Sequence, residues 1–480
     1  MLPDWIVGLS GWAYGLLVLG CLLTALLRKR EPSQALGWAL AIVFLPVIGP
    51  LFFLLFGWNR VSRTLRVKRT HHGQWVEDER IAALAAHVGD LHHVEPLEGR
   101  WGGLSRMLED LGQGPRRGGN AVELYEDGTR AFEAMGEAIA AAKEHVHVEF
   151  FIFRGDDLGR RAIGLLADKV REGVEVRVIV DALGSIGGWK ALRELQQAGG
   201  RVESFLAPLR RPVSPQLRNH RKAVICDGRV AFFGGLNVGR EYLGRWWQKG
   251  SEWCDLHVRV EGAAVWNLQW MFVEDWDYCT GEFLGVPRYF PPIEAMGDSA
   301  LQVLVGGPDT RPNPIRQAFL GAFSRAERSI LVVTPYLVPD LALRDALKLA
   351  AMTGVEVDLV TLSSPPDKWW PYWCGWYYTE ELSAAGVRVW SHEPGMMHAK
   401  AVVVDGEWAM LGTANLDNRS MFLNFEQMAV FDRKADVERI EAALQRIRGR
   451  SVLRDPAEVA RRSWPWRLVV QTSRLLAPIL

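Results

Sequence analysis

The sequence is poor in cysteine and has no excess of charge of either sign. Its 480 residues include five cysteines, an odd number, and no two of them are spaced as C-x-x-C. A disulfide scaffold or a thiolate zinc site is therefore not expected. Lysine plus arginine and aspartate plus glutamate each number 56, so the formal net charge is zero. This balance does not favour a nucleic-acid-binding protein.

Charged residues are also missing from two long stretches near the N-terminus. Residues Trp5 to Leu27 and Ala35 to Gly57 carry no charge, and each is long enough to cross a hydrocarbon layer of roughly 30 Å as a helix. No Lys or Arg precedes the first stretch, so a hairpin of two transmembrane helices is favoured over a cleaved signal peptide. Basic residues follow both stretches and leave the orientation open, and Pro46 and Pro50 leave open a re-entrant second segment.

The rest of the chain contains an internal duplication. Residues 137–153 (EAIAAAKEHVHVEFFIF) and 321–337 (GAFSRAERSILVVTPYL) share one pattern, an amphipathic helix followed by a strand rich in β-branched residues. Residues 173–180 and 354–361 repeat a second strand, GVEVRVIV and GVEVDLVT. Alternating helices and apolar strands indicate two α/β domains, each with a largely buried sheet. The predicted organisation is two transmembrane helices (1–60), a basic helical connector (61–119), and two α/β domains, 120–295 and 296–480, the second ending in an interfacial segment.

One polar motif occurs once in each half. Residues 220–237 read HRKAVICDGRVAFFGGLN and residues 398–415 read HAKAVVVDGEWAMLGTAN, so both fit H-x-K, four residues, Asp, six residues, Gly-x-x-Asn. His and Lys two residues apart on a strand project from the same face. Asp-Gly fits a type I′ hairpin turn, after which the second strand returns and brings the Asn back to the His. Each half thus offers an imidazole, an ammonium and an amide, which together favour an anion site with a nucleophile.

These paired motifs resemble those of the phospholipase D superfamily. With the stretches VEFFIFRGDDLGRRAIGLLADKVREGVEVRVIVDALGS and GTANLDNRSMFLNFE and the two apolar N-terminal runs, the chain is similar to bacterial cardiolipin synthases over essentially its whole length. The resemblance implies a fold of two duplicated phospholipase D-like α/β domains, with mixed sheets flanked by helices. It also implies an integral, multi-pass protein of the bacterial inner membrane.

The resemblance assigns a role to each motif residue. His220 is the expected nucleophile, giving a phosphatidyl-histidine, and His398 the general acid and then base; the near-equivalence of the motifs leaves these two roles exchangeable. Glu241 and Glu426 are expected to orient the histidines. The residues expected to hold the phosphate are Lys222, Lys400, Asn237 and Asn415. Asp227 and Asp405 belong to the catalytic motif, although turn chemistry explains them about as well.

The expected reaction is transfer of a phosphatidyl group from one phosphatidylglycerol to another, which gives cardiolipin and glycerol. The alternatives are hydrolysis by a membrane-bound phospholipase D and a phospholipase D-type nuclease. No cofactor or metal is expected, since the pairs His71-His72 and His92-His93 lie outside the duplicated halves and lack supporting ligands. Phosphatidylglycerol, other anionic phospholipids and the membrane are the expected partners, without nucleic acid. Arginines near the first motif would suit anionic headgroups or simply face solvent: Arg210, Arg211, Arg218 and Arg221.

Overall fold

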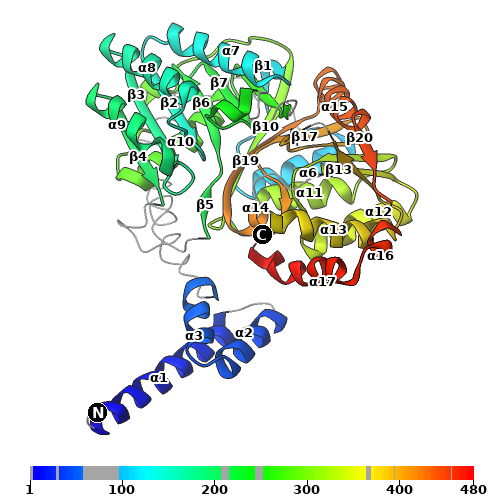
Figure 1. Ribbon diagram of the computed structural model, residues 1–480. Helices are drawn as coiled ribbons and strands as arrows, with labels where there is room; N and C mark the ends of the chain where they lie inside the picture. The colour runs from blue at the N-terminus through cyan, green and yellow to red at the C-terminus, as the bar shows by residue number, and fades with distance from the viewer. Residues whose placement is uncertain are drawn as a thin grey trace. The chain divides into compact units, whose positions relative to one another are not determined.

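The computed structural model describes residues 4–28, 32–57, 97–206, 216–243, 252–363, 369–393, 395–455 and 457–479. The chain divides into two compact units (Figure 1). One unit combines Met1–Val67 with Pro208–Leu217, and the other combines Lys68–Ala207 with Arg218–Leu480.

The N-terminal unit is helical. It contains α1 (Asp4–Arg28), α2 (Pro32–Phe44), α3 (Ile48–Phe52) and the π-helix η1 (Phe53–Gly57). Among the residues described, none of the helices combines the length and the apolar character that a membrane span requires. The prediction of one continuous helix over residues 35–57 is wrong, because the chain turns between α2 and α3 at Pro46, whose ring cannot continue the helical hydrogen bonding.

The larger unit is built on one long sheet, in which the same strand order occurs twice. In the first half the order is β1 (Arg117–Tyr125), β9 (His257–Glu261), β7 (Val230–Gly234), β6 (Lys222–Cys226), β2 (His145–Phe150), β3 (Glu175–Asp181) and β4 (Arg201–Phe205). In the second it is β10 (Ser299–Gly306), β19 (Asn424–Phe431), β17 (Trp408–Gly412), β16 (Ala401–Val404), β11 (Ser329–Val333), β13 (Glu356–Leu362), β14 (Arg388–His392) and β20 (Ser451–Leu453). The antiparallel pair β1 and β10 joins the two halves.

Each half contains a mixed sheet, which confirms the predicted duplicated α/β fold. Strands β2, β3 and β4 run parallel, whereas β6 pairs antiparallel with both β2 and β7. The second half repeats this with β11, β13, β14, β16 and β17. Every residue of β2 is buried, as expected for a strand covered on both faces.

Helices cover the sheet in both halves (Figure 1). The first half has α7 (Gly128–Ala141), α8 (Asp157–Arg171), α9 (Trp189–Gln197), α10 (Val265–Thr280) and the short turns η2 (Ile186–Gly188), η3 (Arg240–Leu243) and η4 (Pro287–Tyr289). The second has α11 (Pro314–Phe323), α12 (Leu341–Met352), α13 (Trp369–Ser383), α14 (Asn418–Phe422) and α15 (Lys434–Gly449), with the short strand pair β12 (Leu337–Val338) and β18 (Leu416–Asp417). Buried Val, Leu, Ile and Phe side chains form a separate core in each half.

The end of the predicted connector belongs to the core of the second half. Helix α6 (Gly99–Asp110) packs against α11, and Trp101 stacks on Trp408 of β17 with ring centroids 5.8 Å apart. Arg100 forms an ion pair with Asp405 at 2.9 Å. These contacts place α6 on the sheet of the second half.

The C-terminal segment has one packed face and one exposed face. It consists of α16 (Ala457–Arg461), α17 (Trp464–Ser473) and the 3-10 turn η5 (Arg474–Ile479). Helix α17 lies against α13, where Val470 is fully buried and the ring of Trp466 is 5.5 Å from that of Trp373. Large apolar side chains of this segment are left in solvent: Trp464 and Leu468 of α17 and Leu475 of η5, which are 75%, 52% and 73% exposed.

Candidate active site

Two equivalent hairpins carry the duplicated motif. Strands β6 and β7 are joined at Asp227-Gly228, and β16 and β17 at Asp405-Gly406. All four turn residues have positive φ, between 53° and 65°, as a type I′ turn requires. The hairpin predicted from the Asp-Gly dipeptides is therefore confirmed.

His220 is held by the second half of the chain. It follows β5 (Arg218–Asn219), which pairs in parallel with β19, and its backbone N–H donates to the carbonyl of Phe425 at 2.9 Å. Its ring nitrogen Nδ1 lies 2.8 Å from Oε2 of Glu426. Because an ionised carboxylate can only accept, Nδ1 carries the proton and Nε2 is left with a lone pair.

His398 is held by the first half in the same manner. It follows β15 (Met396–Met397), which pairs in parallel with β8 (Trp253–Cys254), and its N–H donates to the carbonyl of Cys254 at 2.7 Å. Its Nδ1 lies 2.8 Å from Oδ2 of Asp255. Each half thus supplies one histidine and the carboxylate that orients the histidine of the other half.

This exchange brings the two motifs together. Burial lowers the pKa of Lys222 to about 7; Glu426 opposes the shift, and the charge of Lys400 from the other half adds to it. Burial and the charge of Lys400 lower the pKa of His398 to about 4, and Lys222 adds a further lowering. These interactions indicate that the lysines of the two motifs and His398 lie near one another. Both histidines are 8% exposed, so this site is largely shielded from water.

The carboxylate predicted in the first half is not the one that contacts a histidine. Glu241 lies on η3 and pairs with Arg154 at 3.1 Å. Asp255, which the sequence reasoning missed, makes the contact with a histidine that was predicted for Glu241. The two halves are equivalent at this point in the sheet. Gly234 of β7 pairs with His257, and Gly412 of β17 pairs with Met428. Asp255 and Glu426 each lie two residues before the residue that pairs with the glycine.

The predicted phosphate ligands are all engaged in hydrogen bonds, the two lysines with the motif histidines. Lys222 Nζ donates to the carbonyl of His220 at 2.7 Å, and Lys400 donates to that of His398. The side chain of Asn237 accepts from the N–H of Ile152 at 3.1 Å and donates to the hydroxyl of Tyr242 at 3.0 Å. The Asn415 amide donates to Asp417 at 3.2 Å. These bonds fix the loops after the hairpins, and contact of the two amides with phosphate stays a prediction.

Asp227 and Asp405 lie at the turns, away from the histidines. The carboxylate of Asp227 accepts from the backbone N–H groups of residues 143, 144 and 145, and that of Asp405 from those of residues 327, 328 and 329. Asp227 follows His220 by seven residues, and the five residues of strand β6 between them alone span roughly 16 Å at about 3.3 Å per residue. This geometry favours the turn interpretation over direct participation in the reaction.

The two orienting carboxylates differ in their ionisation. Burial raises the pKa of Glu426 to about 7, although Lys222 and hydrogen bonds from Thr413, Asn424 and Ser420 oppose the rise. Burial alone would also raise the pKa of Asp255, but the adjacent His398 and Lys400 outweigh it and lower this pKa. Asp255 is therefore an anion at neutral pH, whereas Glu426 titrates there.

We expect a narrow maximum of kcat/KM near neutral pH. Activity should rise through about pH 7 as Glu426 ionises, and fall above it as Lys222 loses the charge that attracts a phosphate. In Lys222→Arg the guanidinium stays charged, so the descending limb should move upward by at least about one pH unit. Initial rates at subsaturating substrate from about pH 5 to 9 test this. A kcat/KM that stays constant over that range would contradict it.

The arginines near the first motif have different surroundings. Arg221 is 1% exposed and pairs with Asp275, so the expectation that it faces solvent or a headgroup is wrong for this residue. Arg218 is half-buried on β5. Arg210 and Arg211 lie outside the described residues, as do the histidines at 71, 72, 92 and 93. Among the side chains that the structure does describe, no cluster of three His, Cys, Asp or Glu could hold a metal ion.

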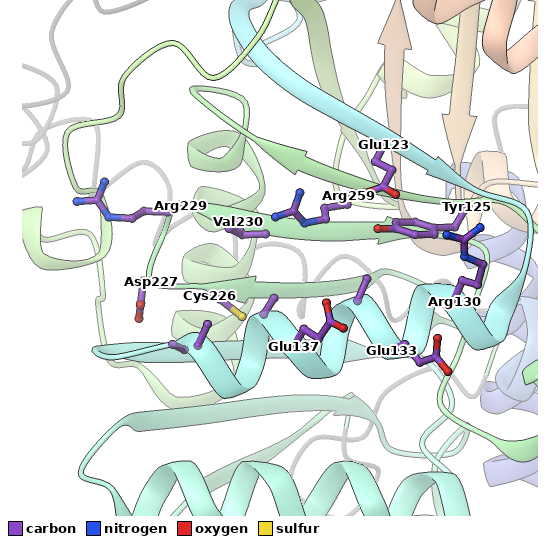
Figure 2. Close-up of a pocket in the computed structure, with 14 residues that line it drawn as sticks. Glu123, Tyr125, Arg130, Glu133, Glu137, Cys226, Asp227, Arg229, Val230 and Arg259 are labelled. Carbon is purple, nitrogen blue, oxygen red and sulfur yellow. The ribbon is translucent and has the colours of Figure 1, made fainter.

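A cavity of about 680 Å³ lies in the first half, away from the histidines. Figure 2 shows its lining, in which Glu133 and Glu137 of α7 lie near Tyr125, Arg130 and Arg259, and the turn residue Asp227 lies at the other end beside Cys226. Both acidic and basic side chains line the cavity, and neither motif histidine is among its lining residues. The cavity is therefore not the reaction site.

The fold and the site define a class of protein: a phospholipase D-type enzyme in which each half carries one H-x-K motif. A family model described as "Cardiolipin synthase, PLD-like domain" matches residues 135–251 and 319–448, and one described as "Phospholipase_D-nuclease N-terminal" matches residues 16–58. The chain belongs to the cardiolipin synthase family of the phospholipase D superfamily.

Individual relatives agree with this assignment. The chain is 35% identical to the cardiolipin synthase of Alkalihalophilus pseudofirmus over 100% of its own length and 95% of the relative. It is 36% identical to the major cardiolipin synthase of Bacillus subtilis, over 83% of this chain and 84% of that one. Its fold is similar to that of the phosphatidylserine synthase of Haemophilus influenzae, with a TM-score of 0.59, 14% identity, and coverage of 78% of this chain and 99% of the other.

Proposed function

We propose that this protein transfers a phosphatidyl group from one phosphatidylglycerol molecule to another and so produces cardiolipin and glycerol. The observation that supports the proposal is the exchange of carboxylates between the halves, which orients His220 and His398, both largely buried. Two imidazoles and two ammonium groups around one phosphate suit a two-step substitution at phosphorus, in which one alcohol oxygen leaves and the oxygen of a second alcohol then bonds to phosphorus. Whole-length similarity to cardiolipin synthases supports the choice of substrate.

In the first step, Nε2 of His220 attacks the phosphorus of the donor lipid and the bond from phosphorus to the glycerol oxygen breaks. His398 gives its Nε2 proton to that oxygen, so that glycerol leaves as a neutral alcohol. His398 is neutral in the empty site, and the negative charge of the bound phosphate raises its pKa and favours the protonated form. Lys222 and Lys400 stabilise the charge on the non-bridging oxygens.

In the second step, His398 takes the proton from a terminal hydroxyl of the acceptor phosphatidylglycerol. The alkoxide oxygen attacks phosphorus, the bond from phosphorus to His220 breaks, and cardiolipin is released. Glu426 and Asp255 stabilise whichever imidazole carries positive charge at each stage. The near-symmetry of the site leaves the assignment of the two histidines to be decided by labelling.

Product analysis tests this function. Purified protein with phosphatidylglycerol vesicles should yield cardiolipin and free glycerol in equal amounts, because exclusion of water from the site favours the lipid hydroxyl. A chelator should leave the rate nearly unchanged, since the mechanism requires no metal. Phosphatidic acid as the main product would instead identify a hydrolase, and metal-reversible loss of activity would contradict the two-histidine mechanism.

We also propose that the protein works at the bacterial inner membrane, where its substrate is found. The N-terminal unit exposes large apolar side chains, including Trp12, Leu16 and Leu27, at 78%, 68% and 81%. Apolar surface of this kind suits contact with lipid. The C-terminal segment of α17 and η5 adds Trp464, Leu468 and Leu475 close in sequence to the basic residues Arg467 and Arg474, a combination typical of an interfacial segment.

Replacing the exposed apolar residues of α17 and η5 should weaken binding to anionic vesicles. The triple variant W464S/L468S/L475S should bind about 10-fold less tightly or worse in a sedimentation assay, because each side chain contributes on the order of 1 kcal/mol when lipid covers it. Its unfolding temperature should change little, since all three side chains are more than half exposed. Met352→Ser, at another exposed apolar position, is the matched control. Undiminished binding of the triple variant would exclude α17 from the membrane contact.

A further inference from the structure

Two arginines from different halves lie beside His220. Arg218, His220 and Lys222 alternate along an extended segment, so their side chains project from the same face. Arg218 is the register partner of Asn424 in the β5–β19 pair. Arg419 of α14 donates to Oδ1 of Asn424 at 3.4 Å. Asn424 in turn donates to Glu426 at 3.1 Å, so Arg419 is linked through Asn424 to the carboxylate that holds His220.

The two guanidinium groups are half-buried and close enough to influence each other. Burial lowers the pKa of both; for Arg419 Asp417 opposes the shift, and the charge of Arg218 adds to it. Asp181 and Asp417 act on these guanidinium groups, and their carboxylates also accept backbone N–H groups, from residues 183, 184 and 219 for Asp181 and from Ser420 for Asp417. Two like charges in this position would be stabilised by an anion that both can contact.

The duplication does not repeat this pair. Met396 stands two residues before His398, where the first half has Arg218. Glu241 stands four residues after Asn237, as Arg419 does after Asn415. Glu241 pairs with Arg154, and its neighbour Tyr242 lies near His398, with ring centroids 6.3 Å apart. Among the described residues, the site is therefore two-fold in its histidines, lysines and carboxylates, but the arginine pair near His220 has no equivalent near His398.

We propose that Arg218 and Arg419 bind the phosphate of the second phospholipid, the one whose hydroxyl accepts the phosphatidyl group. This inference rests on the proposed function. In the proposed mechanism, the two histidines and the two lysines, one of each from either half, all act on the reacting phosphate. Joining two phosphatidylglycerol molecules brings a second phosphate monoanion close to the first, and a guanidinium pair matches its geometry. A neutral acceptor such as free glycerol or water carries no such anion and does not need the pair.

Two readouts from one assay separate the acceptor site from the chemistry. Phosphatidylglycerol vesicles are supplied with radiolabelled glycerol, and both cardiolipin and label incorporated into phosphatidylglycerol are quantified. The second product forms by the same two steps with a neutral acceptor. In Arg218→Gln and Arg419→Gln we expect cardiolipin formation to fall about 10-fold or more, and glycerol exchange to stay within about 3-fold of wild type. Lysine at either position should restore part of the cardiolipin activity.

Arg240→Gln, which removes an exposed charge from η3, is the matched control and should change neither product. Equal loss of cardiolipin and glycerol exchange in a folded Arg218→Gln or Arg419→Gln variant would overturn the proposal, because the arginine would then serve the reacting phosphate. Unchanged cardiolipin formation in both variants would overturn it as well. Wild-type protein that forms neither product would count against the proposed function itself.

Discussion

Replacing either His220 or His398 with alanine is expected to reduce cardiolipin formation by at least about 10⁴-fold while the fold is retained. Each imidazole comes from a different half, and neither half contains a second one oriented by a carboxylate in the described part of the site. Loss of the nucleophile prevents formation of the intermediate, and loss of the acid leaves glycerol as a poor leaving group. Activity is measured with phosphatidylglycerol vesicles, and folding by circular dichroism and the thermal unfolding midpoint. Wild-type-like activity in either variant would remove that residue from the mechanism.

The two roles can be separated with a substrate whose leaving group needs no proton. With phosphatidyl-p-nitrophenol, His398→Ala should still release p-nitrophenol in a burst, because the phenolate leaves without general-acid help. His220→Ala should not, because it lacks the nucleophile. The opposite pattern would exchange the two histidines without changing the rest of the scheme.

The second large effect is expected at the carboxylates exchanged between the halves. Asp255→Asn and Glu426→Gln should each lower kcat by about 10²-fold to 10⁴-fold, since the amide no longer stabilises an imidazolium or fixes its tautomer. The effect should appear in kcat more than in KM, because neither carboxylate contacts substrate in this scheme. Glu294→Gln, on an exposed loop, is the matched control.

Glu241→Gln decides between the sequence interpretation and the structure. If Glu241 orients a histidine, this variant should lose activity as Asp255→Asn does. The ion pair with Arg154 predicts a change of no more than about 3-fold, because this pair is partly exposed. A severe defect in Glu241→Gln together with a mild one in Asp255→Asn would contradict the assignment made from the geometry.

Local sequence was sufficient to predict the duplicated hairpins. H-x-K on a strand and Asp-Gly at a turn are patterns whose geometry follows from neighbouring residues, and positive φ at Asp227 and Asp405 confirms the turn. The alternation of helices and β-branched strands likewise predicted a buried α/β fold in both halves. These features depend on contacts between residues that are close together in the sequence.

The exchange between the halves could not be predicted in this way. Parallel pairing of β5 with β19 and of β15 with β8 joins segments that are far apart in sequence, and no local pattern specifies such a partner. Asp255 was missed for the same reason: Asp255 and Glu426 follow their motifs at different spacings and match only in the register of the sheet. Glu241 was chosen instead because it follows its motif closely.

The second apolar N-terminal run shows that a prediction from local sequence can also be wrong. Absence of charge over residues 35–57 indicated one continuous helix, but the chain is divided into α2, α3 and η1. Hydropathy measures transfer into lipid and does not register that Pro46 interrupts backbone hydrogen bonding. The prolines that the sequence reasoning associated with a re-entrant segment were the more informative signal.

The most direct test of the central claim is identification of the covalent intermediate. Protein mixed with phosphatidylglycerol labelled with ³²P is quenched in base within one turnover, digested and mapped by mass spectrometry. We expect one acid-labile phosphoryl group per chain, located on His220 and absent from His220→Ala, because the two histidines serve one phosphorus. Label on a serine or a carboxylate, or label on His220 and His398 of the same chain at once, would contradict a single site shared by the two halves.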